Sequence, residues 1–144
     1  MREILFRGKR VDNGEWVYGY YAHLPSAAGA ADIIYVPASD PDDSNHTVFV
    51  DPETIGQFTG LTDKNGVKIF EGDIVRFKHD GDFGEKIYYR NYAVEFINTY
   101  VTYGLRLRNR SIHFPFKQGT ASQHDAEVIG NIYDNPELIE DGET

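Results

Sequence analysis

The sequence predicts a mainly β protein, and three observations lead to that prediction. Short runs rich in β-branched and aromatic residues recur along the chain, Gly, Asn and Asp turn signals separate them, and helical periodicity is almost absent. Aromatic residues make up 14% of the 144 residues, which supplies bulky core material for one domain or for two very small modules. We therefore expect a folded β protein with very little helix.

The first expected element is a β-hairpin formed by residues 4–10 and 15–24. Asn13-Gly14 lies between these two strand-like runs and favours a tight turn, because a type I′ turn requires positive φ at both central residues. Along the second strand the side chains would alternate between two faces, with Trp16, Tyr18 and Tyr20 on one and Val17, Gly19 and Tyr21 on the other. Both faces of this strand can therefore be covered.

Two loops and two short strands are expected next. Residues 25–32 are rich in Ala, Gly and Ser, and residues 37–45 are rich in Asp, Pro and Ser, so both segments have the composition of loops. Strands are expected at residues 33–36 and 47–50, where β-branched and aromatic residues gather.

In the rest of the chain, the strand-like runs have the lengths and spacing expected of a small barrel. Strand-like runs occur at residues 55–60, 68–78, 87–101, 105–108, 112–116 and 127–133, with a turn at 63–66 and a short helical turn at 135–138. Five strands of modest length between residues 68 and 133 are what a closed or half-open barrel needs, and an open antiparallel sheet is the alternative. We expect residues 1–60 to form a hairpin and loop region and residues 61–144 the barrel, as one compact unit.

Composition and charge narrow the classes of protein. The chain has 14 Lys and Arg against 23 Asp and Glu, a formal net charge of -9, and no cysteine, so disulfides and thiolate metal sites are excluded. The longest apolar runs are far shorter than the roughly 18 residues of a membrane span, and the N-terminus lacks the apolar stretch of a signal peptide. These features predict a cytoplasmic protein without contact to a membrane.

Three parts of the sequence resemble the YopX family of phage and prophage proteins. They are residues 4–9 with 14–19, residues 55–66 with 69–75, and the closing residues 128–138. The resemblance implies an SH3-type barrel in the C-terminal part and a phage or prophage gene in a bacterial host. It implies no established biochemical activity.

No residue pattern predicts catalysis, a metal or a cofactor. The histidines are scattered along the chain, at positions His23, His46, His79, His113 and His124. None has metal-ligand spacing. Glu71-Gly72-Asp73 fits a tight turn into a strand better than a catalytic carboxylate pair, and residues 40–43 lack the ligand spacing of a calcium loop. We expect no enzyme activity.

The most informative feature is a charge asymmetry. Residues 86–118 carry a net charge of +5, whereas residues 1–85 and residues 119–144 each carry -7. Leu105 and Leu107 alternate with Arg106 and Arg108, so on a strand the arginines would share one outer face. The candidate site residues for nucleic acid or an acidic partner are Arg90, Tyr92, Arg106, Arg108 and Arg110.

Two functions follow from this asymmetry. The preferred one is a non-enzymatic interaction or assembly module, a homo-oligomer or a partner of a phage or host protein, in which the arginines meet the acidic flanks within the chain or between subunits. The alternative is a nucleic-acid-binding accessory protein that uses a basic and aromatic face of the barrel. The net charge of -9 repels nucleic acid at long range, which favours the first.

Overall fold

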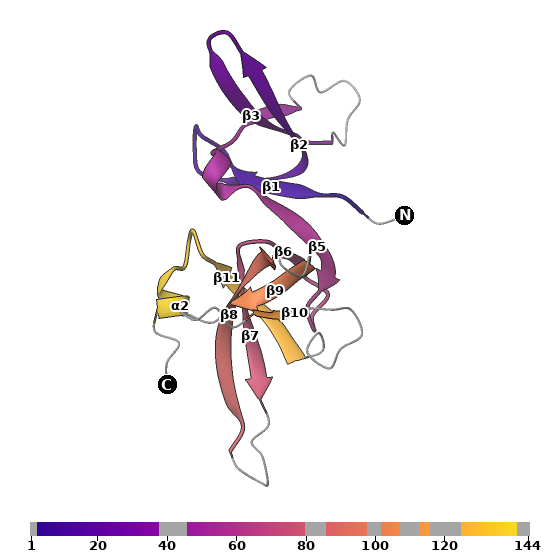
Figure 1. The fold of residues 1–144 in the computed structure, drawn as a ribbon, viewed down its shortest axis with the longest axis vertical. Helices are drawn as coiled ribbons and strands as arrows, with labels where there is room; N and C mark the ends of the chain where they lie inside the picture. Colours follow the sequence, from indigo (N-terminus) through magenta and orange to yellow (C-terminus); the bar gives the residue numbers. More distant parts are fainter. Residues whose placement is uncertain are drawn as a thin grey trace. The chain divides into compact units, whose positions relative to one another are not determined.

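The computed structural model describes residues 3–37, 46–79, 86–97, 102–106, 113–115 and 125–140. The chain divides into two compact units, Met1–Phe58 and Thr59–Thr144. Antiparallel strands make up nearly all of the regular structure, which confirms the mainly β prediction (Figure 1). No helix in the described ranges is both long and apolar enough to cross a membrane.

The first unit is a sheet in which the strands follow the order β4-β3-β2-β1-β5. Its elements are β1 (Phe6–Lys9), β2 (Trp16–Ser26), β3 (Gly29–Tyr35), β4 (Thr47–Phe49), the 3-10 turn η1 (Pro52–Thr54) and the beginning of β5 (Gly56–Thr62). The first residues of β5 pair with β1, and β6 is its neighbour in the second unit.

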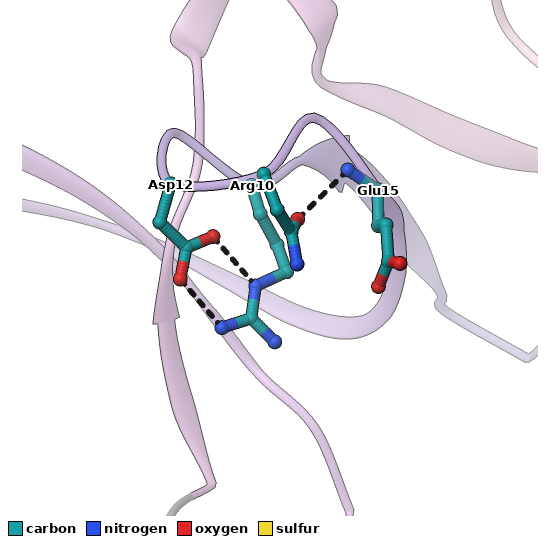
Figure 2. A network of polar contacts seen from close by, with 4 residues as sticks. Arg10, Asp12 and Glu15 are labelled. Carbon is teal, nitrogen blue, oxygen red and sulfur yellow. Dashed lines mark hydrogen bonds and ion pairs between the residues drawn. The ribbon is translucent and has the colours of Figure 1, made fainter.

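The predicted β1–β2 hairpin is confirmed, but its turn is longer than the two-residue type expected. Four residues separate Arg10 from Glu15, and the loop is closed by the Gly14 N–H, which donates to the Arg10 carbonyl over 2.9 Å. Gly14 has φ 72°, a conformation that side chains with a Cβ disfavour. The Arg10 guanidinium also donates twice to the Asp12 carboxylate, over 2.9 and 2.7 Å (Figure 2). This pairing lowers the pKa of Asp12 below its ordinary value.

The loop expected at residues 25–32 is wrong. Strand β2 continues to Ser26 and β3 begins at Gly29, so only residues 27 and 28 connect them (Figure 1). Gly29 has φ 120°, which lets the chain reverse at once. Ala30 and Ala31 pair across the ladder with Pro25 and Leu24, and this pairing holds them in an extended strand.

Strand β2 changes partners along its length. Its first half pairs with β1 as far as Gly19, and its second half pairs with β3 from Tyr20 onward. A Cβ at Gly19 would lie 2.0 Å from the carbonyl oxygen of Tyr35, so no other residue fits there without moving the backbone. Ile34 and Val50, 0% and 3% exposed, form the buried centre on the same face of the sheet.

The second unit contains a five-stranded sheet in the order β10-β9-β8-β7-β11. Its elements are the end of β5, β6 (Lys68–Phe70), β7 (Asp73–His79), β8 (Tyr88–Ile97), β9 (Thr102–Arg106), β10 (His113–Pro115), β11 (Ala126–Asn131) and the short helix α2 (Glu137–Glu140). The pairing does not return from β11 to β10 in the described part of the chain, so this sheet is open and the SH3-type barrel is not confirmed.

Both faces of this second sheet carry a buried cluster. On one face the core consists of Leu61, Ile69, Val75, Phe77, Tyr92, Val94, Leu105 and Ala126. On the other face Ile74 and Ala93 pack with Ile139 of α2, and Ile129, Ile132 and Leu138 surround them. Helix α2 therefore covers part of the sheet's second face, and the remainder of that face carries polar side chains.

Two turns of the second unit are held by buried aspartates. The Asp63 carboxylate accepts backbone N–H groups of Asn65, Val67 and Val128 over 2.8 to 2.9 Å, which ties the 63–67 turn to β11. Asp73 accepts the Phe70 N–H over 2.7 Å and is only 2% exposed. The geometry at Glu71-Gly72-Asp73 is therefore that of the expected turn.

Candidate functional site

The candidate site lies on the polar part of the second sheet's face, beside the cluster covered by α2. Along β7 the side chains alternate, so Val75 and Phe77 are buried while Arg76 and Lys78 are exposed. Neither Arg76 nor Lys78 forms an ion pair with an acid among the residues that the structure describes. Two cations thus project from one strand, two residues apart, on an exposed surface.

A tyrosine of the neighbouring strand completes this surface. Tyr89 is directly opposite Lys78 in the β7–β8 register, and the Arg76 guanidinium carbon lies 4.3 Å from the centre of the Tyr89 ring. At that distance the ring face attracts the cation and orients it. Tyr89 remains 50% exposed, so a partner can still reach the ring.

These residues surround an open pocket of about 360 Å³, which we call the mixed-charge pocket. Its lining consists of Lys64, Arg76, Lys78, Tyr89, Asp125 and Glu127. Lys64 is held at the pocket by the 63–67 turn, because its backbone N–H donates to the Ala126 carbonyl over 3.0 Å. Its ammonium lies 3.6 Å from the carboxylate of Glu127. In the β11–β7 ladder, Glu127 is the residue directly opposite Arg76.

The residues predicted from the sequence are not gathered at this pocket. Arg90 is exposed, and its guanidinium carbon lies 5.2 Å from the Tyr88 ring centre. It is opposite Phe77 in the register, so its side chain leaves the sheet on the other face from Arg76. Arg106 donates from Nε to the Glu95 carboxylate over 2.9 Å, an ion pair within the chain. Arg108 and Arg110 lie outside the described residues.

Tyr92 is a correction to the expected surface. Its side chain is 5% exposed and its ring meets Phe77 edge-on at 5.7 Å, so it belongs to the core and cannot stack on a partner. Burial raises the pKa of its phenol above the ordinary value, although Arg90 acts in the opposite direction. The physical reason is register, because Tyr92 pairs with Val75 on the buried face.

Sequence reasoning missed Lys64, Arg76 and Lys78 as site residues. They lie within residues 1–85, which carry a net charge of -7, so a sum of charge along the chain did not single them out. The alternation of Val75 and Phe77 with Arg76 and Lys78 was a usable signal, since it already placed both cations on the open side of a half-buried strand. The pairing with Tyr89 and Glu127 required the tertiary register.

The pocket's chemistry is that of charge recognition. It presents three cations and two carboxylates around one ring, and the described residues contain no group of three or more side chains that could hold a metal ion. Such a surface can orient a partner by complementary charges and exclude partners of a single sign.

Comparison with solved structures finds a similar fold. The chain resembles protein EF1440 from Enterococcus faecalis, known from a crystal structure, with a TM-score of 0.51 and 20% sequence identity. The similarity covers 96% of this chain and 99% of that one. At this identity the likeness concerns the fold alone.

Comparison with curated proteins gives no match. The model of the family described as YopX protein matches residues 5–140, which is nearly the whole chain and includes every strand described above. The resemblance of the three sequence segments is thus confirmed over the full fold, and the chain belongs to the YopX protein family.

Proposed function

We propose that this protein is a non-enzymatic interaction module that associates with a second copy of itself through the mixed-charge pocket. The observation that carries the proposal is the pocket's composition. Arg76 and Lys78 form no ion pair with the described acids, yet Asp125 and Glu127 line the same pocket. A surface that holds both signs of charge side by side can complement itself.

A two-fold interface brings the same patch of both subunits together. The cations on β7 of one copy can then face Asp125 and Glu127 near β11 of the other, and the reverse contact forms by symmetry. Electrostatic complementarity of this kind contributes specificity and speeds encounter, and it weakens as salt is added.

The two carboxylates favour a protein partner over nucleic acid at this pocket. Phosphate binding gains from cations that neutralise the backbone, and each carboxylate in the same pocket opposes that gain. The net charge of -9 acts in the same direction at long range. Nucleic-acid binding by this face of the second sheet is therefore the weaker candidate.

The setting of the function is also part of the proposal. The sequence contains no residue spacing that matches a catalytic motif, which supports a role in interaction rather than catalysis. The family resemblance supports a phage or prophage gene acting in the cytoplasm of a bacterial host.

Sedimentation velocity over a micromolar concentration range tests the proposal. Wild type should associate at low salt and dissociate at high salt, whereas Arg76→Glu with Lys78→Glu should stay monomeric because it opposes like charges. The matched control is Lys68→Glu with Lys86→Glu, which changes the same net charge at two exposed lysines outside the pocket and should associate as wild type. A monomeric wild type, or a pocket variant that associates normally, would contradict the proposal.

A further inference from the structure

Asparagine is followed by glycine at two positions of the chain, Asn13-Gly14 and Asn65-Gly66. In this dipeptide the backbone nitrogen of the glycine can attack the side-chain carbonyl carbon of the asparagine, because glycine has no Cβ to obstruct the approach. Both pairs are exposed, and beyond the chain neighbours no atom of the described residues lies within 4 Å of a Cβ built at either glycine. Sequence and local space therefore make the two sites equal candidates for deamidation.

The two glycines are also alike in their backbone geometry. Gly14 has φ 72° and Gly66 has φ 80°. The Gly14 N–H donates to the Arg10 carbonyl over 2.9 Å, and the Gly66 N–H donates to the Asp63 carbonyl over 3.0 Å. Each nitrogen must leave this hydrogen bond before it can lose its proton and attack, so each turn has to open locally first. The rate of reaction at each site therefore depends on what holds the turn closed.

A buried carboxylate holds the turn that contains Asn65. Asp63 is 5% exposed, and its Oδ1 accepts the N–H groups of Asn65 and Val67 over 2.8 and 2.9 Å. Its Oδ2 accepts the Val128 N–H of β11 over 2.9 Å, which ties the turn to the sheet. Opening this turn removes buried N–H groups from their acceptor, and a buried donor without an acceptor is costly.

The turn that contains Asn13 has only exposed contacts of its own. The ion pair between Arg10 and Asp12 joins side chains that are 34% and 60% exposed (Figure 2), and an exposed pair adds little stability. Within the described part of the chain, the hydrogen bonds of Asp12, Asn13 and Gly14 all come from residues 10–15. This loop can therefore open without disturbing a third strand.

The Asn13 side chain is also folded toward the atom that attacks it. Its Oδ1 accepts the Glu15 N–H over 2.9 Å, which is an Asx turn in which the side chain bends back along its own backbone. This turn brings Cγ toward the Gly14 nitrogen, and it places an N–H donor at the oxygen where negative charge develops during the attack. In the other turn Asp63 makes the corresponding bond to the Asn65 N–H, so there the Asx turn holds the backbone instead.

We propose that Asn13 is a site of spontaneous deamidation in the folded protein and that the fold protects Asn65. The Gly14 nitrogen loses its proton to water or hydroxide and bonds to Cγ of Asn13, and the side-chain amide leaves as ammonia. The product is a five-membered succinimide. Water then cleaves one of the two carbonyl–nitrogen bonds of the ring, which leaves either aspartate or isoaspartate, the form in which the main chain runs through Cβ.

Either product changes the turn between β1 and β2. A carboxylate at position 13 lies between Asp12 and Glu15, so the loop gains a third acid. Isoaspartate also lengthens the main chain of a loop that the Gly14 N–H closes on the Arg10 carbonyl. The mixed-charge pocket belongs to the second unit, so this inference does not rest on self-association through that pocket.

Peptide mapping by mass spectrometry tests the proposal on the full chain. Folded wild type is kept for weeks at mildly alkaline pH, well below its melting temperature, and then digested. The peptide that contains Asn13 should change from amide to acid about tenfold or more faster than the peptide that contains Asn65, because the Asn13 turn opens more readily. Enzymatic methylation of isoaspartate identifies that product. In the chain unfolded by guanidinium the two rates should become similar.

A pair of variants tests the cause of the protection. Asp63→Ala removes the buried acceptor and should raise the Asn65 rate by about tenfold, toward the rate of Asn13. The matched control is Asp12→Ala, which removes the exposed acceptor of the first turn and should leave both rates nearly unchanged. Thermal unfolding checks that both variants are folded at the temperature of the incubation.

Three results would overturn the proposal. The first is an Asn65 that reacts as fast as Asn13 in folded wild type. The second is an Asn13 that stays intact in the folded protein while the unfolded chain reacts at both sites. The third is an unchanged Asn65 rate in folded Asp63→Ala, which would show that the buried carboxylate does not protect this site.

Discussion

The sheets of the two units place their cations in different surroundings. On the first sheet, Arg7 is 5% exposed and lies with Lys9 against the Trp16 ring. On the second, Arg76 and Lys78 are exposed and share a pocket with Asp125 and Glu127. The two cations of the second sheet can therefore reach a partner, whereas Arg7 cannot. Burial, rather than the number of cations, decides which sheet offers its charge to a partner.

The cores of the two sheets also differ in how much of each face they bury. The first sheet buries one face around Ile34 and Val50, and Tyr20 and Tyr35 are exposed on its opposite face. The second buries the centre of one face and part of the other, where α2 covers Ile74 and Ala93. The mixed-charge pocket occupies the polar remainder of that second face.

The largest expected effect is at Gly19, where a substitution should disrupt the first sheet and so remove one side of the comparison. Gly19→Ala should destabilise the protein by about 3 kcal/mol or more, because the new Cβ would overlap the Tyr35 carbonyl and the backbone must move. Denaturant unfolding measures the stability.

Gly14→Ala is the control for this prediction. No atom lies within 4 Å of the new Cβ, and only the φ of 72° opposes it, so a loss of about 1 to 2 kcal/mol is expected. Equal losses of unfolding free energy in Gly19→Ala and Gly14→Ala would show that the close approach of the Tyr35 carbonyl does not contribute to the destabilisation.

The next effect concerns Asp63, which positions Lys64 at the mixed-charge pocket. Asp63→Ala leaves three backbone N–H groups without their acceptor in a site that is 5% exposed, so a loss of about 3 kcal/mol is expected. Thermal unfolding measures it. The exposed turn aspartate Asp12 is the matched control, and Asp12→Ala should change stability by no more than about 1 kcal/mol. A larger loss at Asp12 than at Asp63 would contradict this account.

A smaller effect sharpens the comparison by removing the acids from the mixed-charge pocket. Asp125→Asn with Glu127→Gln removes both carboxylates and leaves three cations beside Tyr89. Oligonucleotide anisotropy should then show new, salt-sensitive binding with a slope of about -2, and self-association should weaken. Glu53→Gln with Glu137→Gln, two exposed acids outside the pocket, controls for net charge. Identical behaviour of the two variants would show that total charge alone decides binding.

The smallest effect is the pH dependence of the first sheet. Hydrogen bonds from Tyr21 and His23 hold the pKa of Asp32 below its ordinary value of 3.8, and the Asp32 contact raises the pKa of Tyr21 above 10.0. The stability that the Asp32 carboxylate adds to the folded state is therefore present above pH 3.8 and is lost as pH falls through its lowered pKa. The Tyr21 contribution is present below pH 10.0 and is lost as pH rises through its raised pKa.

The melting temperature, measured as a function of pH, checks both contributions on the acid and the alkaline limb of the stability profile. Asp32→Asn should remove the acid limb that belongs to this carboxylate, and Tyr21→Phe should flatten the alkaline limb. Profiles of both variants that match wild type would show that the Asp32 contact does not contribute to the pH dependence of stability.

Much of the local structure was predictable because it depends on neighbours in sequence. The β1–β2 hairpin, the 63–66 turn, the turn at Glu71-Gly72-Asp73 and the helical turn near residue 137 follow from turn residues and capping chemistry. The β2–β3 hairpin was not predicted, because Ala, Gly and Ser have weak strand propensity and only cross-strand pairing holds them extended.

The candidate site was less predictable than the fold. Charge counted along the chain pointed to residues 86–118, but the structure pairs Arg106 with Glu95 and buries Tyr92. It brings Lys64, Arg76 and Tyr89 together from three separate segments. A charge sum treats residues as neighbours when they are close in sequence, whereas a surface is made by residues that are close across strands.

The sequence by itself determined that this chain would be a β protein of the YopX family, with several of its turns where they were expected and its charge unevenly distributed. Alternation along a strand also determined which residues share a face, because successive side chains point to opposite sides. Only the tertiary structure decided which faces are open and which charges meet on them. The physical reason is that cross-strand register and α2 packing set burial, and neither depends on local sequence alone.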